Sequence, residues 1–196
     1  MRVVAVHAPT TGSTTTHDAF TIAVSAARSA GHDVVPIDLA AERFVPVMSR
    51  EEHAAYHRDT PLVTEETRRS AAAVKSAEAF VFVYPTTFTT IPVALKGWFE
   101  RVFVPGVSFV LDPRTHKVRR NLTGVRRIVG IATYDGSRSD VRRSRDNGRR
   151  TIERALRMNT GLRTRTSWIA LHDAGQAGAD EVEAFHGRIE KRMERL

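Results

Sequence analysis

Five short apolar runs recur along the chain, and each is followed by a longer stretch in which apolar residues return every three or four positions. The runs are rich in β-branched and aromatic residues and are bounded by Pro, Gly, Ser and Thr. Continuous apolar runs of this length are typical of strands buried on both faces, as in parallel sheets. The strands expected on this basis are residues 3–7, 34–39, 79–84, 128–133 and 166–171.

The stretches between the runs predict helices. Gly31 ends the first of them, and Ser49 with Glu52 has the spacing of a capping box, which indicates a helical turn. The helices expected are residues 18–30, 64–77, 93–104, 148–158 and 179–195. Residues 109–111 and 117–119 flank a polar turn and predict a hairpin, whereas the basic segment 134–147 is expected to be a loop.

Strand and helix alternate five times, which predicts an α/β protein with a parallel sheet, right-handed crossovers and helices on both faces. Pro36 lacks a backbone N–H, so it places the second strand towards an edge of the sheet. No repeat or linker interrupts the pattern, and we interpret residues 1–196 as a single domain.

Composition narrows the class of protein further. With 41% apolar and 27% charged residues the chain is ordinary for a globular protein. It contains no cysteine, which excludes disulfides, thiolate catalysis and Cys-based metal sites. We find neither the pattern of a secretory signal nor an apolar run of about 18 residues, and we therefore expect a cytoplasmic protein without a membrane span.

The net charge of +8 is concentrated in one part of the sequence, where ten arginines between residues 138 and 165 face three acidic residues. One interpretation is a solvated basic surface. A second is attraction of phosphorylated ligands such as NADPH. A third is binding of nucleic acid, but no helix-turn-helix or stacking motif accompanies the charge, so we expect no nucleic-acid partner.

The most informative motif follows the third expected strand. The apolar run ends at Pro85, a loop of threonines surrounds Phe88, and Pro92 opens an amphipathic helix. The block from Pro85 to Phe103 reads P-x6-P-x-x-L-K-G-W-F-E-R-V-F. It resembles the flavodoxin-like NAD(P)H:quinone oxidoreductases, the NAD(P)H dehydrogenase (quinone) family that includes the modulator-of-drug-activity type.

This resemblance implies a flavodoxin-like three-layer sandwich, with a five-stranded parallel sheet of order 2-1-3-4-5. In such sheets the loops after strands one, three and four converge at the carboxyl edge, where ligands bind. The resemblance also implies that the helix of the block contributes to a homodimer, so that Phe103, Val107 and Phe109 meet a second subunit. Trp98 and Phe99 have the spacing of core residues in that helix.

The first of the three loops is rich in hydroxyl groups and leads into a helix, which is a favourable arrangement for an anion. His7 ends the strand before it. We consider two roles for His7: a hydrogen bond to nearby backbone that shapes the loop, or contact with the cofactor phosphates, as the resemblance implies. The candidate cofactor-binding residues here are His7, Ser13, Thr14 and Thr15.

The second and third loops would surround the flavin ring, according to the resemblance. Phe88 is either a stacking partner of the ring or a core aromatic under the loop. Asp135 stands where relatives carry glycine; a carboxylate near the ring would oppose the negative charge that develops on reduction, unless it points to solvent or pairs with Arg138. The candidate residues are Pro85, Thr86, Thr87, Phe88, Thr133, Tyr134, Asp135 and Gly136.

The function implied is two-electron transfer from NADH or NADPH through flavin N5 to a quinone or similar flat acceptor, in ping-pong order. FAD is favoured over FMN by the resemblance, and NADPH over NADH by the basic segment. Relatives use a Tyr and a His as a proton relay, but Val141 and Asn147 stand near those places, so no catalytic side chain is assigned. The histidine spacing indicates no metal site. The alternative function is that of a regulatory or accessory protein of a transporter.

Overall fold

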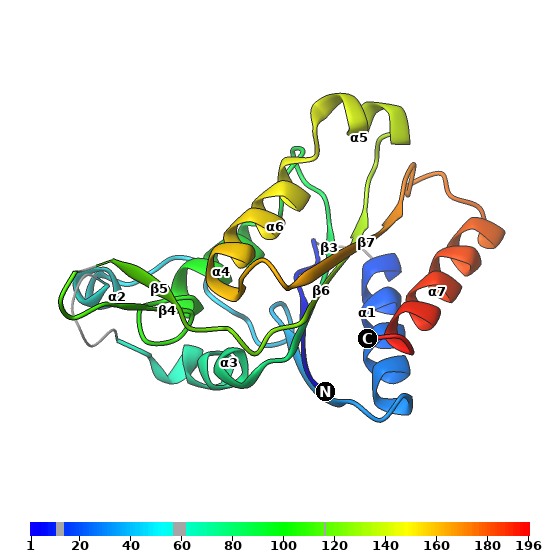
Figure 1. Cartoon of the computed structure of the whole chain (residues 1–196). Helices are drawn as coiled ribbons and strands as arrows, with labels where there is room; N and C mark the ends of the chain where they lie inside the picture. The colour runs from blue at the N-terminus through cyan, green and yellow to red at the C-terminus, as the bar shows by residue number, and fades with distance from the viewer. Residues whose placement is uncertain (11–13, 57–61, 116) are drawn as a thin grey trace.

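A computed structural model describes residues 1–10, 14–56, 62–115 and 117–196 of the chain (Figure 1). Its centre is a five-stranded sheet of order β2-β1-β3-β6-β7, in which every neighbouring pair is parallel. This is the expected order 2-1-3-4-5 once the strands outside this sheet are left out, and β2, which contains Pro36, lies at an edge as predicted. The strands are β1 (Arg2–His7), β2 (Asp33–Asp38), β3 (Ala79–Pro85), β6 (Arg127–Thr133) and β7 (Arg165–Leu171).

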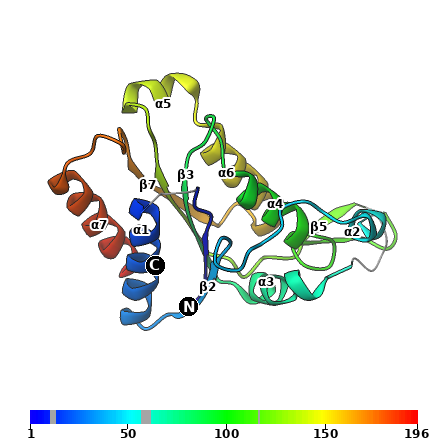
Figure 2. The same ribbon diagram turned by 180° about the vertical axis from the view of Figure 1, so that it is seen from behind.

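Helices cover both faces of the sheet, as Figures 1 and 2 show from opposite sides. Helices α1 (Thr14–Ser29) and α7 (Ala179–Met193) pack on one face; α3 (Glu65–Ser76), α4 (Val93–Val102) and α6 (Asn147–Thr160) lie on the other. Beyond α3 and α4 lie the short helix α2 (Arg50–Ala55) and the antiparallel hairpin of β4 (Phe109–Leu111) and β5 (Val118–Arg120). No helix in the described parts of the chain is long and apolar enough to cross a membrane.

The two apolar layers explain why the central strands are continuously hydrophobic. Successive side chains of a strand point to opposite faces, so each run must satisfy two cores at once. Val4, Phe80 and Phe82 belong to the core under α3, α4 and α6. Val3 and Val81 belong to the core under α1 and α7.

Three strands end in register at the carboxyl edge. The backbone N–H of Ala8, just after β1, donates to the carbonyl of Val83 at 3.0 Å. The N–H of Thr86, just after β3, donates to Thr133 at 2.8 Å, and that of Tyr134 donates to Leu171 at 2.8 Å. Because each strand remains bonded to its neighbour one residue beyond its end, the three loops leave the sheet along one line.

Helix α4 is held in place by the residues of the L-K-G-W-F block. Trp98 is fully buried, as expected, and its indole Nε1 donates to Ser70 Oγ at 3.1 Å. Phe99 is partly buried against the same core. A Cβ at Gly97 would lie 2.2 Å from the carbonyl oxygen of Pro46, so only glycine lets this helix approach the preceding segment.

Arg101, in the last turn of α4, is a buried cation that the sequence analysis did not single out. Its guanidinium contacts Glu52 at 2.9 Å and Glu66 at 2.7 Å, and it stacks over the ring of Phe44 at 5.1 Å. The hydrogen bonds from Arg101 keep the pKa of the Glu66 carboxyl below its usual value, although burial opposes this. The network ties α2 and α3 to α4.

The structure corrects two of the sequence-based expectations at this point. Residues 134–147 were expected to be a loop, but α5 (Arg138–Ser144) forms there, because the Ser137 hydroxyl caps it by accepting a hydrogen bond from the N–H of Asp140. Phe103 and Val107 were expected at a subunit interface, but they are 8% and 2% exposed, because this chain's own core covers them.

Candidate functional site

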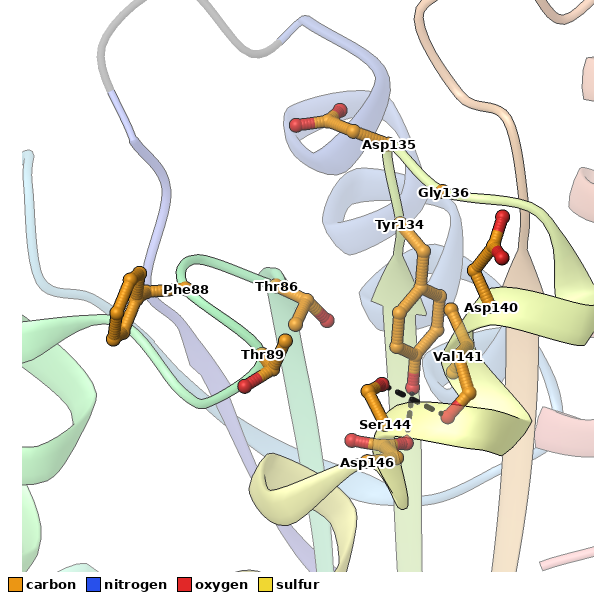
Figure 3. A pocket seen from close by; sticks show the side chains of 10 residues that line it. All are labelled: Thr86, Phe88, Thr89, Tyr134, Asp135, Gly136, Asp140, Val141, Ser144 and Asp146. Atoms are coloured by element: carbon orange, nitrogen blue, oxygen red, sulfur yellow. Dashed lines mark hydrogen bonds between the residues drawn. The ribbon is translucent and has the colours of Figure 1, made fainter.

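A pocket of about 260 Å³ opens at the carboxyl edge between the loop after β3 and the segment that follows β6 (Figure 3). Both segments carry predicted cofactor-binding residues, and five of these residues line the pocket. The pocket is lined by Thr86, Phe88, Thr89, Tyr134, Asp135, Gly136, Asp140, Val141, Ser144 and Asp146. Its size is somewhat below the usual range for small-molecule sites, roughly 300–1,000 Å³, and suits one flat ring rather than a whole dinucleotide.

The loop after β3 is a tight turn with a strained backbone. Thr87 and Thr90 form an isolated antiparallel bridge, with N–H to carbonyl distances of 3.1 and 2.9 Å. Between them Phe88 and Thr89 have φ angles of 45° and 59°, the left-handed pair that a two-residue type I′ turn requires. Such turns favour Asn and Gly, so a Phe-Thr pair is held there against its intrinsic preference.

This turn presents Phe88 to solvent. Its side chain is 100% exposed, so the interpretation of Phe88 as a core aromatic is wrong: the left-handed turn lifts it off the sheet. Figure 3 shows the ring on the outer side of the loop, directed away from Tyr134. A fully exposed aromatic beside a pocket is a ready stacking surface.

Tyr134 forms the inner wall of the pocket and belongs to a fixed hydrogen-bond network. Its hydroxyl donates to Asp146 Oδ2 at 2.6 Å and accepts from Trp168 Nε1 at 3.1 Å (Figure 3 shows the first bond). Burial, followed by the adjacent Asp146 carboxylate, raises the pKa of Tyr134. The phenol is therefore neutral, and the His172 ring stacks on it with centroids 5.0 Å apart. Burial and the neighbouring Arg138 lower the pKa of His172, so this ring is also neutral near pH 7.

One wall of the pocket, formed by α5 and the residues after it, is not predicted from the sequence. Asp140 and Ser144 lie on α5, and Val141 had been noted only for the absence of a relay residue. Asp146 caps α6 by accepting a hydrogen bond from the N–H of Arg149 at 3.1 Å. The spacing of Ser137 and Asp140 is the signal that could have revealed this helix.

The buried His7, at the end of β1, pairs with the partly buried Asp38 at the end of β2. His7 Nδ1 lies 2.9 Å from Asp38 Oδ2, and the other carboxylate oxygen accepts from the N–H groups of Ala40 and Ala41. Burial lowers the pKa of His7, against the opposing effect of Asp38. Burial also disfavours the charged form of Asp38, but the hydrogen bonds outweigh it and lower the pKa of Asp38. The backbone role first considered for His7 is therefore replaced by a side-chain pair.

The second ring nitrogen of His7 is unusual. His7 is 1% exposed, and its Nε2 is buried without a hydrogen-bond partner among the described residues. His17, on α1, lies close by, with ring centroids 5.8 Å apart. One ligand atom each from His7, His17 and Asp38 lie within 4.8 Å of one another, a cluster that the sequence spacing did not reveal because the three come from different elements.

The remaining predicted residues that the structure describes are not part of the pocket lining. Thr14 and Thr15 form the first turn of α1 instead of a loop, and Ser13 lies outside the described residues. Pro85 and Thr133 are the paired last residues of β3 and β6. The Asp135 side chain turns away from Tyr134 in Figure 3, and no ion pair joins it to Arg138 in the described structure.

A parallel sheet of order 2-1-3-4-5 between helix layers, with a pocket at its carboxyl edge, defines an open α/β protein of the flavodoxin type. The family model for the flavodoxin-like fold matches residues 1–191, and the chain belongs to this family.

Comparison with solved structures agrees with the fold. The NAD(P)H:quinone oxidoreductase from Methanothermobacter marburgensis superposes with a TM-score of 0.83 at 18% identity, covering 100% of this chain and 98% of that one. An FMN-dependent NADH-azoreductase from Bacillus anthracis str. Ames Ancestor, in complex with FMN, gives a TM-score of 0.73 at 16% identity, with coverages of 99% and 98%. At these identities the likeness establishes the fold.

Curated relatives match over a shorter stretch. NAD(P)H dehydrogenase [quinone] 1 of Cavia porcellus is 32% identical over 102 residues, which is 44% of this chain and 37% of that protein. The Rattus norvegicus protein of the same name is 33% identical over the same share. The match thus spans little more than a third of the length of these relatives.

Proposed function

We propose that this protein is an enzyme, a flavin-dependent NAD(P)H:quinone oxidoreductase that accepts quinones or similar flat aromatic molecules. The observation that carries the proposal is the pocket at the carboxyl edge, between the loop that carries the exposed Phe88 and the buried Tyr134 ring. In open α/β sheets ligands bind at this edge. Membership of the flavodoxin-like family and the names of the curated relatives support the same activity.

The residues present fit a flavin. A flavin nucleotide needs a site for phosphate, hydroxyl contacts for its ribityl chain and a surface for its ring. His7 offers a buried Nε2 without a partner in the described structure, next to the first turn of α1, where an anion is favoured. Thr86, Phe88 and the backbone around Gly136 would hold the ring. We propose FAD or FMN as the cofactor, with FAD favoured by the motif.

When bound, the flavin supplies N5 as the hydride acceptor and passes two electrons on in ping-pong order. The residues of the chain would position the flavin and shield its ring from water. Tyr134, held neutral between Asp146 and Trp168, keeps a rigid uncharged wall against the ring. Uptake of a proton by His7 would convert Nε2 into a donor toward phosphate, while Asp38 stabilises the charge that results.

Absorption spectroscopy of the purified protein is the direct test. We expect a yellow protein with near-stoichiometric flavin, and the mass of the released cofactor distinguishes FAD from FMN. Anaerobic NADPH should bleach the flavin, and a quinone should restore the colour. A colourless protein that binds neither added flavin would contradict the enzyme and support the accessory role.

A pair of exposed apolar side chains provides a matched test of the site. Phe88→Ala removes the stacking surface at the pocket rim, and Met158→Ala removes a side chain that is 73% exposed on α6 outside the pocket. We expect Phe88→Ala to weaken flavin binding about two- to tenfold, since aromatic stacking contributes about 0.5–1.5 kcal/mol, whereas Met158→Ala should leave it unchanged. Equal affinities of the two variants for flavin would show that the flavin ring does not stack on Phe88.

Two further proposals accompany this function. Because NAD(P)H is a reductant of the cell interior, the enzyme would work in the cytoplasm. We also propose a homodimer, in which a second copy covers the exposed apolar surface at the start of α4 that includes Val93.

A further inference from the structure

A second hollow, of about 550 Å³, lies directly beside the pocket, between the edge strand β7 and the helices α5 and α6. It shares Tyr134, Val141 and Asp146 with the pocket, so the two are continuous. We call it the arginine groove. Its basic residues are Arg138, Arg142, Arg145, Arg149 and Arg150.

Most of this positive charge is not neutralised within the groove. Arg149 pairs with Glu153 at 3.1 Å. Asp146 already uses one oxygen for Tyr134 and the other for the cap of α6. In the described part of the chain Arg138, Arg142, Arg145 and Arg150 form no ion pair, although all four line one hollow. Uncompensated guanidinium groups that converge on a cavity are suited to a phosphorylated ligand, because each offers a planar fork of donors.

The floor of the groove is rigid and flat. The Arg149 guanidinium lies over the Trp168 ring, 5.6 Å from its centroid. The indole is fixed because Nε1 donates to Tyr134 and because its ring packs directly on Gly130, where a Cβ would lie 2.4 Å away. A guanidinium that stacks on an aromatic ring presents a second planar face, on which a purine base can stack.

We propose that the arginine groove binds the adenosine end of NADPH and holds its 2′-phosphate, so that the enzyme prefers NADPH to NADH. The inference rests on the proposed function, since it assigns the adjoining pocket to the flavin and the nicotinamide. The 2′-phosphate carries about two negative charges that NADH lacks, and the free arginines are placed to bind it. Nucleic acid is a less suitable ligand, because the arginines line a hollow next to the pocket rather than an extended face.

Direct binding separates the groove from catalysis. We would titrate the protein as purified with adenosine 2′,5′-bisphosphate and with adenosine 5′-monophosphate by calorimetry. We expect the bisphosphate to bind about tenfold tighter or more, since charge-assisted hydrogen bonds to a phosphate are strong. The double variant Arg142→Gln/Arg145→Gln should abolish this preference.

The matched control is Arg154→Gln/Arg157→Gln, which removes the same charge from α6 outside the groove. It should keep the preference for the bisphosphate. Equal binding of the two nucleotides by the unmodified protein, or equal losses in both double variants, would overturn the inference. Competition by single-stranded RNA as effective as that by the bisphosphate would also overturn it.

Kinetics distinguishes failure of this inference from failure of the proposed function. In stopped-flow mixing we expect NADPH to reduce the flavin with a kcat/KM at least about tenfold above that of NADH, and the groove variant to remove this difference. Reduction by NADH and NADPH at equal efficiency would leave the oxidoreductase in place and overturn the selectivity. Absence of reduction by either would overturn the proposed function.

Discussion

At the scale of single residues, the rim of the pocket is built from conformations that side chains normally avoid. Phe88 and Thr89 occupy the left-handed region in succession, and Arg145 and Asp146 do so again between α5 and α6. Each costs roughly 1–2 kcal/mol for a residue other than glycine. The strain falls on the two segments that form the pocket walls, where it turns Phe88 outward and aims Asp146 at Tyr134.

The turn offers a test of this strain. Thr89 is exposed and has few contacts to lose, so Thr89→Gly should raise the free energy of unfolding by about 0.5–1 kcal/mol, because glycine adopts the left-handed region freely. Urea denaturation would measure this. The control Thr151→Gly, at an exposed position within α6, should lower stability by about 0.3 kcal/mol, and a loss at both positions would contradict a strained turn.

The His7–Asp38 pair predicts the direction of a pH effect on stability. Both folded pKa values lie below the unfolded ones, about 6.5 for His and 3.9 for Asp. The unfolded chain therefore takes up protons first as the pH falls, and stability declines below about pH 6.5 and again as the pH falls through the folded pKa of Asp38. In flavin-free protein, His7→Gln should flatten the first decline in melting temperature. An unchanged profile would contradict a buried neutral His7.

At the scale of elements, the buried Arg101 network decides how α2, α3 and α4 fit together. The block that carries the family resemblance contains Gly97 and Arg101, and both have packing roles. Gly97 permits contact with the Pro46 segment, while Arg101 satisfies two carboxylates from separate helices. These two residues of the block thus fix the position of α4, the helix that follows the pocket loop.

Breaking this network should be costly. Glu52→Gln leaves the side-chain shape but removes one partner of a charge that is 4% exposed, and we expect the free energy of unfolding to fall by about 3 kcal/mol. The control Glu65→Gln breaks the exposed pair with Arg68 and should cost less than about 1 kcal/mol. Urea denaturation of the two variants measures both losses in the free energy of unfolding. Similar small losses would show that the buried pair contributes little.

At the scale of the whole molecule, two kinds of exposed surface lie beside the pocket. Arginines without an ion pair line the groove at the β7 edge, and the exposed apolar side chains of Phe88 and Val93 lie on the loop after β3 and at the start of α4. The first surface suits an anionic substrate and the second suits another protein surface.

The proposed homodimer gives a prediction at this scale. Light scattering should give about twice the chain mass of 21.8 kDa. Val93 is 74% exposed, so Val93→Ser should weaken association by about 1 kcal/mol, or about fivefold, because it exposes less apolar surface to be buried. Met158→Ser is the control. A monomer at micromolar concentrations would contradict the dimer.

Hydrophobic patterning was sufficient for the architecture. Apolar runs such as 79–84 have to be strands covered on both faces, and their alternation with helices leaves few topologies, because crossovers are right-handed. The same reasoning placed Phe88 and Tyr134 at one edge of the sheet. These properties follow from local periodicity and chain connection, which the order of residues carries directly.

Tertiary structure alone decided how the site is assembled. The pairing of His7 with Asp38, the proximity of His17 and the convergence of arginines from α5 and α6 join residues from separate elements. The outward turn of Phe88 depends on backbone angles that no propensity favours. Such contacts depend on distances across the folded chain and on strain that the rest of the fold sustains, and linear spacing encodes neither.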